Sequence, residues 1–137
     1  MANKGIVSIR ILNLPGSGRG CAFCAIDSGR PPQPPDPDEP LRLAKAVKAL
    51  RLRHAVVTSV TRDDLQDGGA GHYASVVSAL RQECPGTTIE CLIPDFCGSF
   101  QALATLMASP PDILAHNIET VLKAGRPVQK KPGKNKE

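Results

Sequence analysis

The sequence predicts an α/β fold of about four parallel strands and three helices. Two observations lead to this prediction. Four short apolar segments of strand length alternate with three segments of helical periodicity, and turn-forming Pro and Gly residues separate them. Strands that alternate with helices pair in parallel, with right-handed crossovers. A length of 137 residues fits one domain.

The first strand is expected over residues 6–14, which are apolar and rich in β-branched side chains and stop at Pro15. A loop of small residues follows. Residues 30–40 then contain six prolines. Proline lacks a backbone donor and has a fixed φ, so this segment cannot be a helix or an interior strand. It is predicted to be a stiff, extended connector.

A helix is expected over residues 40–52, because Leu43, Val47 and Leu50 recur on one helical face. Proline and two acidic residues at its start suit the first turn of a helix. Residues 54–60 form a near-continuous apolar run, which is typical of a parallel strand buried on both faces.

The rest of the sequence continues the alternation of helix and strand. Leu103, Leu106 and Met107 are expected to face inward in the last helix. Helices are expected over 72–83 and 100–108, strands over 88–93 and 112–116, and loops over 61–71 and 94–99. We place residues 1–121 in one domain and residues 122–137, which are rich in Lys, Gly and Pro, in a disordered basic tail.

The charge distribution argues against a nucleic-acid-binding domain. The chain has 17 Lys and Arg residues and 13 Asp and Glu residues, for a net charge of +4. Six of the basic residues and one acid lie in residues 123–137, so residues 1–122 have a net charge of −1. No segment approaches the roughly 20 apolar residues that cross a bilayer, and no signal peptide is recognisable. We expect a cytoplasmic protein, or an organellar one in a eukaryote.

Five cysteines are an odd number, and cytosolic thiols stay reduced, so metal binding or burial is favoured over disulfides. Cys21 and Cys24 have the spacing at which two thiolates reach one metal or cluster, although a redox pair remains an alternative. Cys84 and Cys91 are expected to be small buried residues. Cys97 follows a predicted strand, so it is expected either to have a functional role or to be a small buried residue.

Functional loops of parallel α/β folds lie at the carboxyl ends of the strands. This rule selects the loop with the two close cysteines and the segments 58–70, 94–98 and 116–120. Segment 58–70 contains Arg62 and three aspartates beside two glycines, and segment 116–120 contains a His, an Asn and a Glu close together. Each feature alone fits ordinary turn and capping chemistry. Together they indicate a site at one edge of the sheet.

Several blocks of the sequence resemble lipoyl synthase, a radical S-adenosylmethionine enzyme. They include Cys-Ala-Phe-Cys at 21–24, Arg-Asp-Asp-Leu-Gln-Asp-Gly-Gly-Ala at 62–70, Ile-Pro-Asp-Phe-Cys-Gly at 93–98 and Ala-His-Asn-Ile-Glu-Thr-Val at 115–121. The blocks lie in the family's order and cover about residues 17–121. The resemblance implies part of a six-stranded (β/α) barrel and a 4Fe-4S cluster held by three cysteines, with S-adenosylmethionine on the open iron.

The activity implied by this resemblance is the radical insertion of two sulfur atoms at carbons 6 and 8 of a protein-bound octanoyl group. The implied partners are an octanoylated lipoyl carrier domain and an iron–sulfur cluster donor. Cys21 and Cys24 match the second and third cluster ligands, and Phe23 would lie against the adenine. The residues expected to line the cofactor and substrate cavity are Thr58, Ser59, Asp63, Asn117 and Glu119. No catalytic residue is assigned.

The sequence also departs from the family. Ser17 stands where the family has its first cluster cysteine, and a serine hydroxyl is a poorer iron ligand than a thiolate. The auxiliary cluster motif and the later barrel strands are missing, which predicts a truncated chain with impaired activity. The alternatives are a non-catalytic remnant that binds metal or nucleotide weakly, and an interaction module that uses the basic tail.

Overall fold

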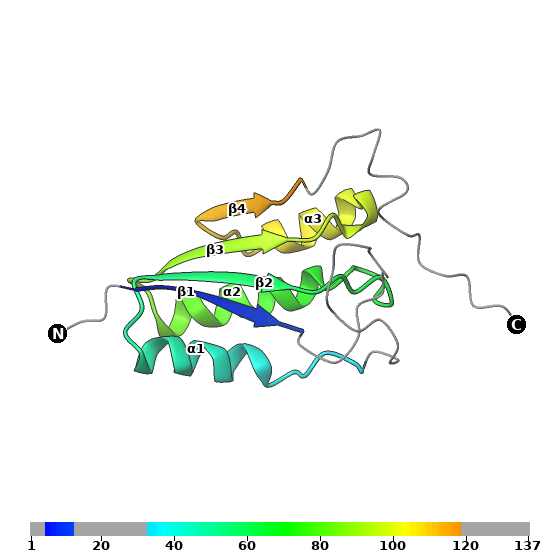
Figure 1. Cartoon of the computed structure of the whole chain (residues 1–137). Helices are drawn as coiled ribbons and strands as arrows, with labels where there is room; N and C mark the ends of the chain where they lie inside the picture. The colour runs from blue at the N-terminus through cyan, green and yellow to red at the C-terminus, as the bar shows by residue number, and fades with distance from the viewer. Residues whose placement is uncertain (1–4, 13–32, 119–137) are drawn as a thin grey trace, which may run out of the picture.

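A computed structural model describes residues 5–12 and 33–118, which form a four-stranded parallel sheet and three helices (Figure 1). The prediction of an α/β fold with these elements is confirmed. The elements are β1 (Ile6–Ile11), α1 (Glu39–Ala49), β2 (His54–Ser59), α2 (Ala70–Glu83), β3 (Thr88–Ile93), a short turn (Phe96–Gly98), α3 (Phe100–Met107) and β4 (Ile113–His116). The strands lie side by side in chain order, β1-β2-β3-β4, and every neighbouring pair is parallel.

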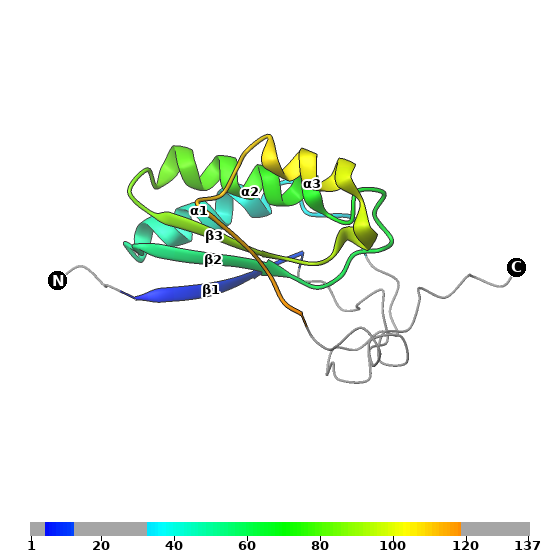
Figure 2. The same ribbon diagram turned by 90° about the horizontal axis from the view of Figure 1, so that it is seen from above.

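All three helices cover the same face of the sheet (Figure 2). Burial along β2 therefore alternates: Ala55 and Val57 are fully buried, whereas Val56 and Thr58 are only partly covered. The prediction of a strand buried on both faces was wrong. The apolar run is continuous in sequence, but the described part of the chain supplies helices for one face only.

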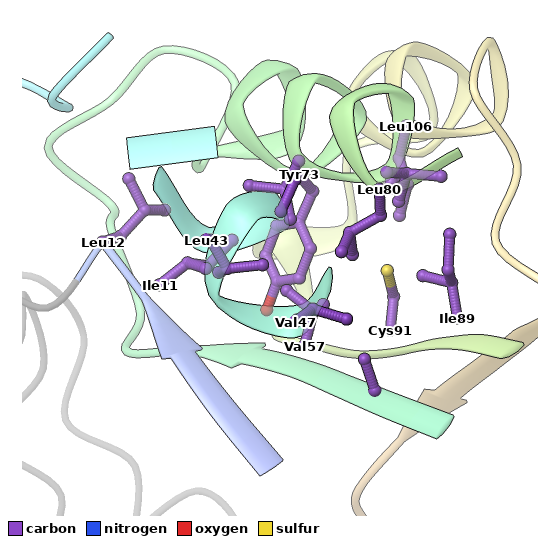
Figure 3. Packing of buried hydrophobic residues seen from close by; sticks show 14 of the residues in the cluster. Ile11, Leu12, Leu43, Val47, Val57, Tyr73, Leu80, Ile89, Cys91 and Leu106 are labelled. Atoms are coloured by element: carbon purple, nitrogen blue, oxygen red, sulfur yellow. The ribbon is translucent and has the colours of Figure 1, made fainter. Parts of the chain in front are cut away.

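The core lies between the sheet and the helices, with α2 in the middle of the helix layer (Figure 3). Tyr73 of α2 is fully buried, and its hydroxyl lies 3.0 Å from both Ser59 Oγ and the Leu92 carbonyl oxygen. Burial raises the pKa of this hydroxyl far above its usual range. Tyr73 therefore stays neutral and ties α2 to the ends of β2 and β3.

Two helix ends differ from the prediction. Leu50 is 55% exposed, because α1 stops at Ala49 and the chain reverses through Arg51, whose φ is 50°. The N–H groups of Arg51 and Leu52 bond to carbonyls of the last helical turn, and Leu52 is buried in place of Leu50. Met107 is 45% exposed, since α3 packs against α2 on one side only.

Most of the other boundaries shift by one or two residues, and the end of β1 shifts by three. Helix α2 begins at Ala70, two residues before the expected start, because the Asp67 carboxylate accepts hydrogen bonds from the N–H groups of Gly69 and Gly71. Strand β1 ends at Ile11; residues 13 and 14, which were expected to extend it, lie outside the described residues. Within the described ranges, no helix has the length and apolarity to cross a membrane.

Two glycines allow the loop after β2 to pack closely against the loops on either side. Gly69 has a φ of 92°, and a Cβ there would lie 2.6 Å from Leu12 Cδ1, just after β1. Gly68 has a φ of 61°, and a Cβ there would lie 3.0 Å from Phe96 Cδ1, just after β3. The two glycines thus bring together the chain ends of three neighbouring strands.

Gly69→Ala is expected to lower the free energy of unfolding by about 1–3 kcal/mol, because it combines a left-handed φ with a clash against Leu12. Gly86→Ala is the matched control. No atom lies within 4 Å of a Cβ at that position, so its effect should stay within about 0.5 kcal/mol. Denaturant unfolding measures both variants, and equal losses would contradict the close-packing account.

Candidate functional site

The carboxyl ends of the four strands meet at one edge of the sheet, on the right in Figure 1. The register places Ile11 beside Ser59 and Thr58 beside Leu92, and it places Ile93 beside His116. The predicted functional segments after β2, β3 and β4 are therefore neighbours in space. The expected convergence at this edge occurs because the strands are parallel and adjacent in chain order.

Thr58 and Ser59 point to opposite faces of the sheet, because side chains alternate along a strand. Ser59 lies on the face that the helices cover, where it contacts the Tyr73 hydroxyl and its own Oγ donates to the Val60 carbonyl at 2.9 Å. By the same alternation, Thr58 lies on the opposite face, which has no helix in the described part of the chain. Thr58 is therefore partly exposed on that face, whereas the hydroxyl of Ser59 is used in contacts within the chain.

Asp63 and Cys97 lie together, although they come from different loops. The Cys97 thiol donates to Asp63 Oδ1 at a distance of 3.3 Å. Cys97 is exposed, and the backbone of Phe96 and Cys97 is left-handed, with φ values of 46° and 53°. Such values are strained for residues other than glycine and cluster at functional sites. The sequence predicted both residues at this edge, but the contact between them depends on the left-handed turn.

Asn117 directly follows β4 and is exposed. Its neighbour His116 places Nδ1 2.8 Å from the Ile93 carbonyl oxygen, which ties the end of β4 to β3. Beside His116 is a mostly apolar hollow of about 290 Å³, between the turn after β3 and the start of α3. It is lined by neither Thr58, Asp63 nor Asn117, so it is separate from the predicted polar site.

The other predicted site residues, Cys21, Phe23, Cys24 and Glu119, lie outside the described residues, as does Ser17. Within residues 5–12 and 33–118, no group of three or more His, Cys, Asp or Glu side chains could hold a metal ion.

Cys84 and Cys91 are buried, as predicted. Burial raises the pKa of the Cys91 thiol to about 12, and it also raises that of Cys84, whose Sγ donates to the Ala44 carbonyl. Both thiols therefore stay protonated at neutral pH and are poor metal ligands.

Arg62 belongs to the predicted polar loop, but it was not among the residues expected to line the cavity. It follows β2 and is only 1% exposed. Its Nε and Nη2 donate to the two carboxylate oxygens of Asp64 at 2.8 Å each, and Nη2 also donates to the Gln33 carbonyl at 2.6 Å. The hydrogen-bonded guanidinium lowers the pKa of Asp64 below its ordinary value of 3.8. The signal in the sequence that could have identified Arg62 is a charged residue within three positions of the end of a buried strand.

A second charged contact lies near the end of β1. Glu39 Oε2 accepts a hydrogen bond from the Leu12 N–H at 3.1 Å and lies 2.6 Å from His72 Nε2. In the sequence Glu39 fitted the role of an acid in the first turn of a helix. The structure adds a connection from β1 to the starts of α1 and α2.

Residues 14–137 match the sequence model of the Radical SAM superfamily. The chain belongs to this superfamily. Over 103 residues, which are 75% of this chain, it is 60% identical to lipoyl synthase of Trichlorobacter lovleyi, 55% identical to that of Chlorobaculum parvum and 50% identical to that of Caldanaerobacter subterraneus. These residues cover 37%, 35% and 36% of the respective relatives, so the radical SAM chain spans about a third of their length.

Membership of this superfamily implies a 4Fe-4S cluster and S-adenosylmethionine. The described residues fit the organic cofactor by their chemistry: the Thr58 hydroxyl, the Asp63 carboxylate and the Asn117 amide can bond its ammonium and hydroxyl groups. They do not supply a cluster ligand set in this radical SAM chain.

Asp64→Ala is expected to lower the free energy of unfolding at neutral pH by about 3 kcal/mol, because it leaves the buried Arg62 guanidinium without its carboxylate. The pKa of Asp64 is lower in the folded chain than the ordinary value of 3.8, so the pair stabilises the fold above that pH. This stability is lost as the pH falls through the folded pKa.

The difference between the parent protein and Asp64→Ala should therefore shrink below pH 3.8 in denaturant unfolding measured across pH. Arg42→Ala is the control, since Arg42 pairs with Asp36 on the exposed surface and should have a much smaller effect. A loss for Asp64→Ala that is independent of pH would contradict this account.

Proposed function

We propose that this chain forms part of the active site of a lipoyl synthase. The observation that supports the proposal is that Thr58, Asp63 and Asn117 lie in or directly after β2 and β4, whose carboxyl ends are at the same edge of the sheet. It is supported by identity of 50–60% to lipoyl synthases over 75% of the chain. When bound, the cluster and S-adenosylmethionine supply one-electron radical chemistry.

Seven of the predicted site residues have a binding role in this proposal. Cys21 and Cys24 hold the cluster through their thiolates, and Phe23 packs against the adenine of S-adenosylmethionine. The Thr58 hydroxyl and the Asp63 carboxylate bind its polar groups from the helix-free face and from the loop after β2. Asn117 and Glu119 bind from the segment that follows β4.

Ser59 has a different role, in which it supports the site from the helix layer. Its hydroxyl and the Leu92 carbonyl both contact Tyr73, so these groups fix the ends of β2 and β3 relative to each other. We propose that the substrate is the octanoyl group of a lipoyl carrier domain, and that an iron–sulfur cluster donor loads the chain. The product chemistry is insertion of sulfur at carbons 6 and 8.

Ser17 is expected to limit activity, because its hydroxyl is not ionised at neutral pH and cannot replace a thiolate. The second candidate function is therefore a weak metal or nucleotide binder without catalysis. Ser17 favours this second function, and the iron content of the protein distinguishes it from lipoyl synthase activity.

Anaerobic reconstitution with iron and sulfide tests the proposal. The protein should bind iron, and Ser17→Cys should raise the content to about four irons per chain. Cys21→Ala and Cys24→Ala should abolish binding, and reduction of the loaded protein with S-adenosylmethionine should release 5′-deoxyadenosine. Cys84→Ala is the control, because its thiol is buried against α1 and should not affect iron content. Iron binding that survives loss of both Cys21 and Cys24 would rule the proposal out.

Thr58→Val and Ser59→Ala separate the two faces of β2. Thr58→Val removes a hydroxyl from the helix-free face and should weaken binding of S-adenosylmethionine to the reconstituted protein by about 3–10-fold. Ser59→Ala should leave the affinity unchanged, since its hydroxyl contacts Tyr73 and Val60. Equilibrium dialysis measures both, with thermal unfolding to check folding. The opposite ranking would show that Thr58 is not a cofactor ligand.

A further inference from the structure

The two outer strands of the sheet, β1 and β4, each have one side without a neighbouring strand. The sheet order is β1-β2-β3-β4, and within residues 5–12 and 33–118 no strand pairs with the outer side of either one (Figure 1). Backbone N–H and C=O groups on these sides can pair with a strand of another chain. Apart from Arg10, neither strand contains the proline, lysine or bulge that commonly blocks such pairing.

Large apolar side chains are exposed beside both of these strands. Ile6 of β1 and Leu50, at the end of α1, are exposed on one side of the sheet. Met107 of α3 and Ile113 and Leu114 of β4 are exposed on the other side. Exposed apolar groups next to an unpaired strand indicate a surface that is covered when the chain associates.

The two sides have complementary shapes on the face that the helices cover. Beside β1 lies a hollow of about 370 Å³ between this strand and α1, and Val7, Ile9 and Leu50 are among its mostly apolar lining residues. In β4 the register places Leu114 beside the buried Cys91, so the Leu114 side chain also lies on the helix-covered face. Apolar side chains at the β4 side therefore match an apolar hollow at the β1 side.

A second copy of this chain can bring the two sides together. All four strands run in the same direction, and all three helices lie on one face (Figure 2). Strand β4 of one copy can therefore extend the sheet at β1 of another, with every helix still on the same face. Two copies supply eight strands, the number at which a parallel barrel closes with side chains filling its interior.

We infer that the chain forms a twofold dimer in which β4 of each protomer pairs in parallel with β1 of the other. Leu114 and Met107 cover the hollow between β1 and α1, and burial of this apolar surface drives the association. The helix-free face, which carries Thr58, then faces the interior of the dimer. The inference goes beyond the proposed function, because the association requires neither iron nor S-adenosylmethionine.

Sedimentation velocity of the protein without iron tests the inference. The protein should sediment with twice the mass of one chain, and this species should not grow as the concentration rises, because both outer strands are paired in a closed dimer. A monomer at all concentrations up to roughly 0.1 mM would overturn the inference. A series of ever larger species would overturn it too, since that result shows open-ended pairing.

Leu50→Lys and Leu41→Lys form a matched pair of variants. Leu41 lies in α1 and Leu50 at its end, with exposed fractions of 47% and 55%, but only Leu50 lines the hollow beside β1, whereas Leu41 borders α2. Leu50→Lys should raise the dissociation constant of the dimer about tenfold or more, and Leu41→Lys should leave it unchanged. Thermal unfolding checks that both variants fold. Equal dissociation constants would contradict the proposed contact.

A mixture of two variants shows which strands meet. Leu114→Glu changes the β4 side, so alone it should weaken the dimer as Leu50→Lys does. An equimolar mixture of the two variants should associate again, because one of its two contacts is unchanged and the other joins opposite charges. A mixture that stays monomeric, or an unweakened dimer of Leu114→Glu, would show that β4 does not meet β1. Either result would overturn the inference, whatever the iron content of the reconstituted protein.

Discussion

The parallel hydrogen bonding of four consecutive strands determines where the candidate site residues Thr58, Asp63 and Asn117 lie. Because β1 to β4 pair in chain order, the residues that follow each strand reach the same edge of the sheet. Thr58, Asp63 and Asn117 come from two strands that are not neighbours, yet they share this edge. A shift of one residue in the register would turn Thr58 toward the helices and Ser59 away from them.

Placement of all three helices on one face has a second consequence. One side of the sheet forms the core with Tyr73 at its centre, and Thr58, which points to the other side, is partly exposed. Such an arrangement is that of consecutive β/α units in a barrel, in which the second face lines the interior. The radical SAM superfamily assignment and this one-sided sheet are therefore consistent.

Charged groups at the carboxyl edge contact different parts of the chain. Asp63 contacts a strained, exposed turn, while Asp67 caps α2 and Asp64 neutralises Arg62. Four charged residues lie within six positions in the sequence, and their roles differ because the backbone turns between them. The number of acidic residues in a segment of sequence therefore does not tell how many of them belong to one site.

The order and type of the helices and strands follow from the sequence alone, because apolar periodicity, proline and glycine are local signals. The cysteine spacing and the resemblance of residues 62–70 to lipoyl synthase were also available there. Only the tertiary structure decided which face of β2 is covered, and it brought Cys97 to Asp63 and Arg62 to Gln33. These contacts join segments about 30 residues apart, and the strand pairing that creates them is a long-range property that no local pattern contains.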